Sequence, residues 1–88
     1  MTAKQRRELL AQSHTLNAVA TIWANDVSDA VVAQVRACLA GRALVKVRVR
    51  ADSGPACDAA AAELARRVPC ELVKRVGRVA VLYRPVES

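Results

Sequence analysis

The sequence predicts a small α/β (α+β) domain in which helices pack against a four-stranded mixed sheet. Segments with helical and strand patterns alternate along the chain, which is typical of strand–helix–strand units. Leu44–Arg50 alternates valine with lysine or arginine, and a strand would place the valines on one face and the cations on the other. A length of 88 residues is enough for one small core, so we expect residues 1–88 to form a single domain.

The first part of the chain predicts a helix followed by a short buried strand. Thr2, with Gln5 three residues later, fits a helix capping box, and the residues from Ala3 to about Ser13 are then expected to be helical. Leu16–Ile22 is apolar and contains β-branched residues, which favours a buried strand. Residues 23–26 are expected to connect this strand to the next helix.

The middle of the chain predicts a second helix that leads into the alternating strand. Ser28 is a suitable N-cap for this helix, and Gly41 is placed to end it in the left-handed conformation. Leu44–Arg50 then follows as the strand. The expected apolar stripe of the helix consists of Val31, Val32, Val35 and Leu39.

The last part predicts a third helix and a closing β-hairpin. Pro55 suits the first helical position, and Pro69 ends the helix. Glu71–Val76 and Val79–Arg84 are expected strands, joined by a tight turn at Gly77–Arg78. The predicted order is therefore α-β-α-β-α-β-β, with parallel pairing across helical connections and an antiparallel final hairpin. The inward face of the third helix is expected to be Cys57, Ala61, Leu64, Ala65 and Val68.

The chain is strongly basic, with a formal net charge of +6 and eleven arginines among its fourteen cations. This balance favours a nucleic-acid partner, because a planar guanidinium suits bidentate contacts with phosphate. The alternative for any basic face is a solvated outer surface. No segment approaches the roughly 20 apolar residues of a membrane span, and the amino-terminal pattern is not that of a signal peptide. We therefore expect a soluble cytoplasmic protein without a membrane partner.

Nothing in the sequence predicts catalysis, a metal site or a cofactor. Cys38, Cys57 and Cys70 have no CxxC spacing, and with His14, the only histidine, they match no usual zinc-ligand spacing. No serine lies in a GxSxG context. A lone histidine also leaves few candidates for a general base. We expect a protein that is not an enzyme and whose thiols are reduced.

Three segments match one family in order and spacing. They are Thr2-Ala-Lys4-Gln5-Arg6 with His14 and Leu16, then Leu44–Val49, then Leu72-Val73 with Gly77, Val79, Val81, Leu82, Tyr83, Arg84 and Pro85. The chain is similar along its whole length to the CRM domain, the chloroplast RNA-splicing and ribosome-maturation module, whose single-domain bacterial form is the YhbY family. The resemblance implies a mixed sheet with helices, similar in shape to the carboxy-terminal domain of a bacterial translation initiation factor.

The same resemblance implies an RNA-binding function without catalysis. Bacterial members of the family are associated with the precursor of the large ribosomal subunit, and plant relatives with repeated domains promote intron splicing. The partners expected for this chain are therefore RNA, ribosomal RNA above all, and precursor large ribosomal subunits. Nothing in the sequence fixes the oligomeric state, and we expect a monomer.

One loop departs from the family pattern. Members usually carry a GxxG loop between the first strand and the second helix, where glycines let the RNA backbone approach and expose N–H groups to phosphate. The corresponding positions here are Trp23, which is bulky, and Asp26, which is anionic. Asn25 remains in the loop and tolerates unusual backbone angles. This departure favours a second hypothesis: a protein-interaction or scaffold module that kept the fold and lost the RNA loop.

The candidate RNA contacts are cations from three segments together with two loop residues. An exposed Trp23 ring would stack on an unpaired base, whereas the alternative is a ring folded over the sheet edge. Cations at the first helix start are unfavourable beside its positive end, and a phosphate would offset that cost. The hairpin arginines are expected to cluster. The complete set is Lys4, Arg6, Arg7, Trp23, Asn25, Lys46, Arg48, Arg50, Arg75, Arg78 and Arg84.

Overall fold

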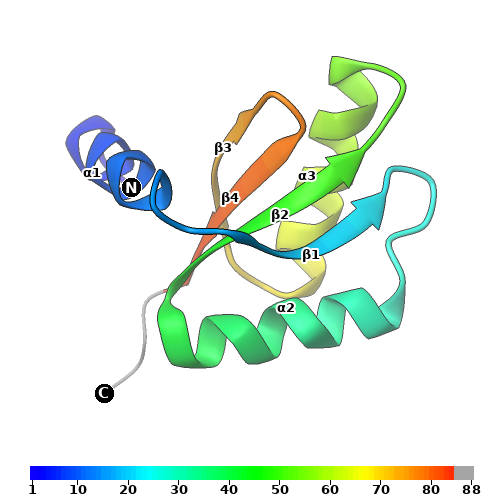
Figure 1. The fold of residues 1–88 in the computed structure, drawn as a ribbon, viewed down its shortest axis with the longest axis horizontal. Helices are drawn as coiled ribbons and strands as arrows, with labels where there is room; N and C mark the ends of the chain where they lie inside the picture. The colour runs from blue at the N-terminus through cyan, green and yellow to red at the C-terminus, as the bar shows by residue number, and fades with distance from the viewer. Residues whose placement is uncertain (85–88) are drawn as a thin grey trace.

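The computed structural model describes residues 1–84 and contains three helices and four strands (Figure 1). The predicted fold class and element order are confirmed. Pro85, which the family resemblance includes, lies outside the described residues. The elements are α1 (Ala3–Ser13), β1 (Ala18–Trp23), α2 (Asp29–Arg42), β2 (Leu44–Arg50), α3 (Gly54–Arg67), β3 (Glu71–Val76) and β4 (Val79–Tyr83).

The four strands form one mixed sheet in the order β1-β2-β4-β3. β1 and β2 are parallel and are connected through α2, as expected for a strand–helix–strand unit. β4 is antiparallel to both β2 and β3. The hairpin turn between β3 and β4 contains Gly77 at a positive φ of 59°, a conformation that glycine adopts without steric cost.

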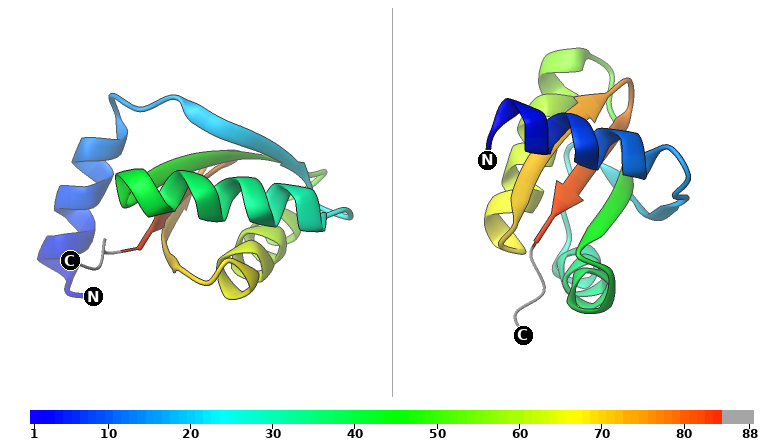
Figure 2. Two further views of the ribbon diagram at one scale, coloured as in Figure 1. Left: turned by 90° about the horizontal axis from the view of Figure 1, so that it is seen from below. Right: turned by 90° about the vertical axis from the view of Figure 1, so that its left-hand side faces the viewer.

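The main core lies between the sheet and the helices α2 and α3, which cover one of its faces (Figure 2). The valines of β2 alternate toward this core, and Val47 and Val49 are fully buried. Helix α3 lies close to the sheet because its inward face includes the small residues Ala60 and Ala61. Burial of this apolar surface is the main term that stabilises the fold.

Helix α1 packs on the opposite face of the sheet, and only at one end (Figure 2). Leu9 of α1 joins Leu44, Val73 and Val81 in a second, smaller core cluster. Leu44 opens β2, so α1 covers the end of the sheet where that strand begins. No helix of residues 1–84 lies over the rest of this face, and we call that part the open face.

Side-chain hydroxyls cap all three helices at their starts. The Oγ atoms of Thr2 and Ser28 accept hydrogen bonds from the backbone N–H groups of Gln5 (3.1 Å) and Val31 (3.2 Å), which confirms both predicted caps. Ser53, which the sequence reasoning missed, caps α3 in the same way through the N–H of Ala56 (3.2 Å). Among residues 1–84, no helix is long and apolar enough to cross a membrane.

Four predicted boundaries are wrong: the end of α2, both ends of β1, and the end of β4, which ends at Tyr83 and not at Arg84. Gly41 does not end α2, which continues to Arg42, and Ala43 takes the positive φ of 64° instead. The chain must reverse at Ala43 because Leu44 is already paired with Tyr83 in the sheet, and the Ala43 carbonyl accepts a hydrogen bond from the Arg84 N–H (2.8 Å). β1 covers Ala18–Trp23 and therefore begins later than predicted and includes Trp23.

Candidate nucleic-acid interface

The cations of β2 lie on the open face because they alternate with its buried valines. Arg48 and Arg50 are exposed, whereas Val47 and Val49 between them are fully buried. The parallel register pairs Thr21 with Arg48 and Trp23 with Arg50. Neighbouring residues in register project from the same face of a sheet, so the two arginines lie beside the outward-facing side chains of β1.

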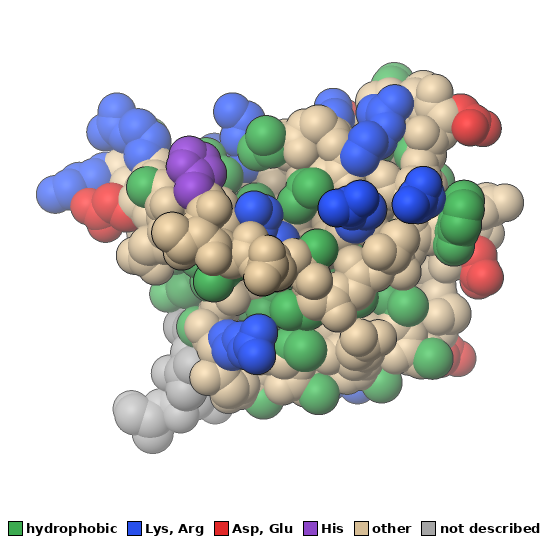
Figure 3. All heavy atoms as spheres, viewed as in Figure 1, with side chains coloured by type: hydrophobic (Ala, Val, Ile, Leu, Met, Phe, Trp, Pro, Cys, Tyr) green, Lys and Arg blue, Asp and Glu red, His purple; other side chains and the backbone are tan. Residues whose placement is uncertain are grey.

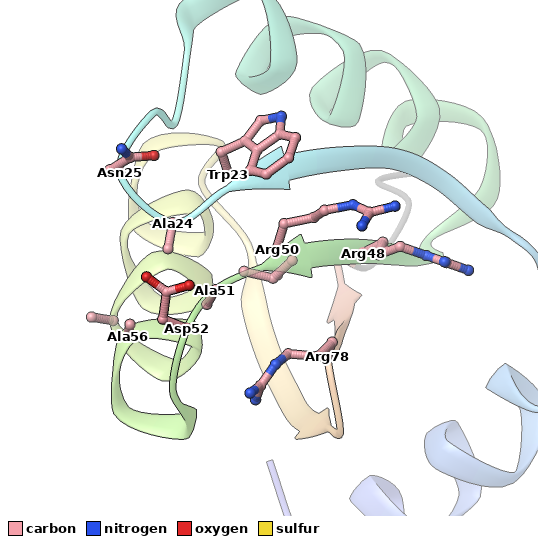
Figure 4. A pocket seen from close by; sticks show the side chains of 11 residues that line it. Trp23, Ala24, Asn25, Arg48, Arg50, Ala51, Asp52, Ala56 and Arg78 are labelled. Carbon is pink, nitrogen blue, oxygen red and sulfur yellow. The ribbon is translucent and has the colours of Figure 1, made fainter.

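A groove with a volume of about 920 Å³ occupies one end of the open face. Its walls come from the end of β1 with the following turn, the end of β2 with the following loop, the start of α3 and the hairpin (Figure 4). Arg48, Arg50 and Arg78 supply its positive charge, and Asp52 lies on the loop side. Three stretches distant in sequence, residues 23–25, residues 48–59 and Arg78, therefore form one concave basic site.

Trp23 is the most exposed large apolar side chain of the groove, with 58% of its surface accessible. The guanidinium carbon of Arg50 lies over the indole ring, 5.7 Å from its centroid, within the range of a cation–π contact. Figure 4 shows the two side chains next to each other at the ends of β1 and β2. The ring is therefore held beside a cation and is not folded into the core.

The segment from Trp23 to Asp26 forms a tight turn without glycine. The Asp26 N–H donates to the Trp23 carbonyl (2.9 Å), and the Ala24 N–H donates to the Arg50 carbonyl of β2 (2.8 Å). Ala43 is the one non-glycine residue of the described chain with a positive φ, so Asn25 and its neighbours adopt ordinary backbone angles. The N–H groups of Ala24 and Asp26 donate hydrogen bonds within the protein. These two N–H groups are therefore not free to bind phosphate.

A second group of cations extends from the open face toward α1. Lys4, Arg6 and Arg7 are exposed in the first turn and a half of α1. On the face seen in Figure 3, lysine and arginine side chains gather from α1 across β2 to the hairpin, and acidic side chains lie at the margins. Lys46 lies between the two groups, half-buried, and its Nζ donates to the Leu16 carbonyl (3.2 Å).

The ion pairs of the molecule lie away from the open face. Within residues 1–84, the ion pairs are Arg66–Glu63, Arg67–Asp29 and Arg75–Asp58. None of them includes a cation of the groove, of α1 or of β2. Within the described chain, the arginines that face the groove therefore form no ion pair, although the Asp52 carboxylate also lines it.

The expected cluster of Arg75, Arg78 and Arg84 does not form. An irregularity between Leu72 and Lys74 shifts the alternation of β3 by one residue, so Arg75 projects from the helix-covered face. Its guanidinium binds Asp58 of α3, and these hydrogen bonds raise the pKa of Arg75. Arg84 follows β4 at the end opposite the hairpin turn. Of the three, only Arg78 lines the groove.

Arg75 instead connects the hairpin turn to α3. Its Nη1 donates to the Gly77 carbonyl (2.8 Å) while its Nε binds Asp58. The guanidinium also lies beside Gly54, the first residue of α3, where an added Cβ would be 3.4 Å from Nη2 of Arg75. Arg75 thus holds in place the turn that carries Arg78.

The structure brings five of the predicted site residues together in the groove, and it adds lining residues that were not predicted. Trp23, Asn25, Arg48, Arg50 and Arg78 all line the groove. Sequence reasoning missed Asp52 and the alanines at the start of α3, which form the opposite wall. The position of Asp52 directly after β2 could have indicated that it lies near the site. The wall of the groove on which it lies, however, depends on how α3 packs.

Two observations concern the metal-binding and nucleophilic side chains of the described residues. Residues 1–84 contain no group of three or more histidine, cysteine or carboxylate side chains placed to hold a metal ion. Burial, together with the nearby Glu71 carboxylate, raises the pKa of Cys70 to about 11 against the opposing effect of Arg84. The Cys70 thiol is therefore protonated at neutral pH and is a poor nucleophile.

Comparison with known proteins gives one family and two named relatives. The family model of the CRS1/YhbY (CRM) domain matches residues 1–84. An RNA-binding protein of Haemophilus influenzae is 28% identical over 88 residues, which cover 100% of this chain and 89% of that protein. The solution structure of a hypothetical Staphylococcus aureus protein, described as a candidate RNA-binding protein, superposes with a TM-score of 0.87 at 26% identity. That match covers 100% of this chain and 92% of the other.

Proposed function

The chain belongs to the CRS1/YhbY (CRM) domain family, and from that premise we propose that it is a non-catalytic RNA-binding protein that uses the open face and α1. The observation that carries the proposal is the set of cations that face the groove without carboxylate partners within residues 1–84. Such cations bind phosphate with release of condensed counterions from the RNA. The two named relatives, one described as RNA-binding and the other as a candidate for it, add support.

The proposed contacts are directed at the RNA backbone more than at base edges. Most of the cations in the groove and on α1 are arginines, and a guanidinium forms bidentate hydrogen bonds with phosphate. Phosphate contacts position a protein on nucleic acid but carry little sequence information. We therefore expect broad affinity for RNA, with shape and strand state as the main sources of selectivity.

We propose the precursor of the large ribosomal subunit as the RNA-containing partner, in the cytoplasm. The support is the family resemblance, whose bacterial members are associated with that particle. A domain of 88 residues with a charge of +6 suits a small factor that binds exposed ribosomal RNA during assembly. Sedimentation of lysate particles tests this part of the proposal: the protein should migrate with large-subunit precursors, and its absence from them would exclude this role while leaving RNA binding intact.

The salt dependence of RNA affinity tests the RNA-binding proposal itself. With about four to six phosphate contacts, log affinity should fall with log salt at a slope of about −3 to −5. Replacing Arg6 and Arg7 by glutamine should weaken binding to all RNA sequences similarly. The matched control is Arg66→Gln on α3, whose side chain pairs with Glu63. Affinity that does not change with salt, or binding weaker than about 10⁻⁴ M, would contradict the proposal and favour a protein-interaction module.

A further inference from the structure

We propose that Trp23 and Arg50 form a binding site for one unpaired base, so that the protein prefers single-stranded RNA to duplex RNA. This inference rests on the proposed RNA-binding function and assigns its strand selectivity to one end of the open face. The site consists of the exposed indole ring at the end of β1 and the guanidinium beside it on β2.

The first step of the argument is the unusual exposure of the ring. A tryptophan in a small domain with a thin core would bury a large apolar area if it folded inward. Trp23 instead keeps 58% of its surface accessible and lies at the edge of a concave groove. The β1 register turns its side chain outward with Thr21, whereas Ile22 between them enters the main core. The outward position is therefore fixed by the strand.

The second step is the distribution of charge around the ring. Arg48, Arg50 and Arg78 lie on the strand and hairpin side of the groove, and Asp52 lies on the loop side (Figure 4). A phosphate is attracted to the arginines and repelled by the carboxylate. A nucleotide whose phosphates lie against the arginines can then place its base against the ring of Trp23. A protein partner would need an acidic surface of matching shape, because the apolar part of the groove, formed by Trp23, Val49 and alanines, lies beside three arginines.

The third step is strand selectivity. Stacking on an aromatic side chain needs a base with a free face, which single strands provide and internal base pairs of a duplex do not. Every base has such a face, so the site tolerates any sequence. Arg48 and Arg78 still contact phosphates of either form, and duplex RNA should bind through charge alone.

The experiment compares one RNA in two strand states with three proteins. An unstructured 12-nucleotide RNA and the blunt duplex of the same sequence are titrated with the wild type, Trp23→Ala and Trp23→Phe. Trp23→Ala should weaken single-strand binding by about 5- to 150-fold, the range for loss of one stacked base, and change duplex binding by less than about twofold. Trp23→Phe should retain most of the affinity, because another aromatic face is present. Since Trp23 is the only tryptophan, single-stranded RNA should also quench the wild-type fluorescence.

The outcomes separate this inference from the function on which it rests. If Trp23→Ala binds both RNA forms like the wild type, or weakens both equally, the base site is excluded while RNA binding stands. Unchanged tryptophan fluorescence at saturating single-stranded RNA would also exclude the base site. A wild type that binds neither RNA would instead refute the proposed function. Thermal unfolding of each variant checks that the substitutions leave the fold intact.

Discussion

Arg48 and Arg75 both project from the sheet, but they leave it from opposite faces. Arg75 lies on the helix-covered face, where it binds Asp58 of α3 and the Gly77 carbonyl. Arg48 lies on the open face beside Thr21, with no ion pair to another residue of the described chain. Arginine thus stabilises the packing of the hairpin and α3 on one face, and it is a cation without an ion pair in the described chain on the other.

The difference extends to the other arginines of each face. Arg36 of α2 donates to the carbonyls of Val68 (2.7 Å) and Arg67 (3.2 Å) at the end of α3. Arg67 in turn binds Asp29 and the Val27 carbonyl. These bonds connect the helices to each other, whereas the Arg50 guanidinium lies over the exposed ring of Trp23. A basic side chain is therefore a candidate RNA contact here only where the fold leaves it without a partner in the described chain.

The largest expected effect is a difference in the free energy of unfolding between valine-to-alanine substitutions on the two faces of the sheet. Val47→Ala removes two buried carbon atoms from the main core and should lower the free energy of unfolding by about 2–3 kcal/mol, including the cavity left behind. Val76→Ala changes a residue with 54% of its surface exposed and should stay within about 0.5 kcal/mol of the wild type. Urea denaturation followed by circular dichroism measures both. If both substitutions lowered the free energy of unfolding equally, Val76 would be buried in solution and the open face would be covered.

An intermediate effect is expected where the helix layer joins the sheet. Ala43→Gly relieves a positive φ of 64°, and Gly41→Ala replaces glycine inside the last turn of α2, where a new Cβ meets no atom within 4 Å. Each change should stabilise the protein by about 0.5–1 kcal/mol. Thermal unfolding measures this, and the RNA affinity of both variants should equal that of the wild type. Destabilisation by Gly41→Ala would mean that the helix ends earlier than Arg42.

The smallest expected effects separate the two roles of arginine directly. Arg78→Gln should leave stability unchanged and make the slope of log affinity against log salt shallower by about 0.7–0.9, the contribution of one phosphate contact. Arg75→Gln should lower the urea midpoint, because it breaks the contacts with Asp58 and the Gly77 carbonyl. Its salt slope should stay at the wild-type value. If Arg75→Gln reduces the salt slope as much as Arg78→Gln does, Arg75 also contacts phosphate, and the two arginines do not have different roles.

Local features could be predicted well from the sequence because short-range physics governs them. The valine–cation alternation of β2 fixes which side chains share a face, and the caps at Thr2 and Ser28 depend on residues only three positions away. The hairpin turn at Gly77–Arg78 and the inward face of α3 follow for the same reason. The wrong end predicted for α2 shows the limit, since the reversal at Ala43 is imposed by the pairing of Leu44 with Tyr83.

The sequence by itself determined the element order, the buried valines and the excess of arginine. Only the tertiary structure decided which arginines are free. That decision depends on one register shift in β3, which turns Arg75 toward Asp58, and on α1, which covers one end of the second face and leaves the other open. The groove around Trp23 arises in the same way, because the parallel pairing of β1 with β2 and the packing of α3 bring distant segments together. Long-range packing has no local sequence signal, since it depends on the summed contacts of the whole chain.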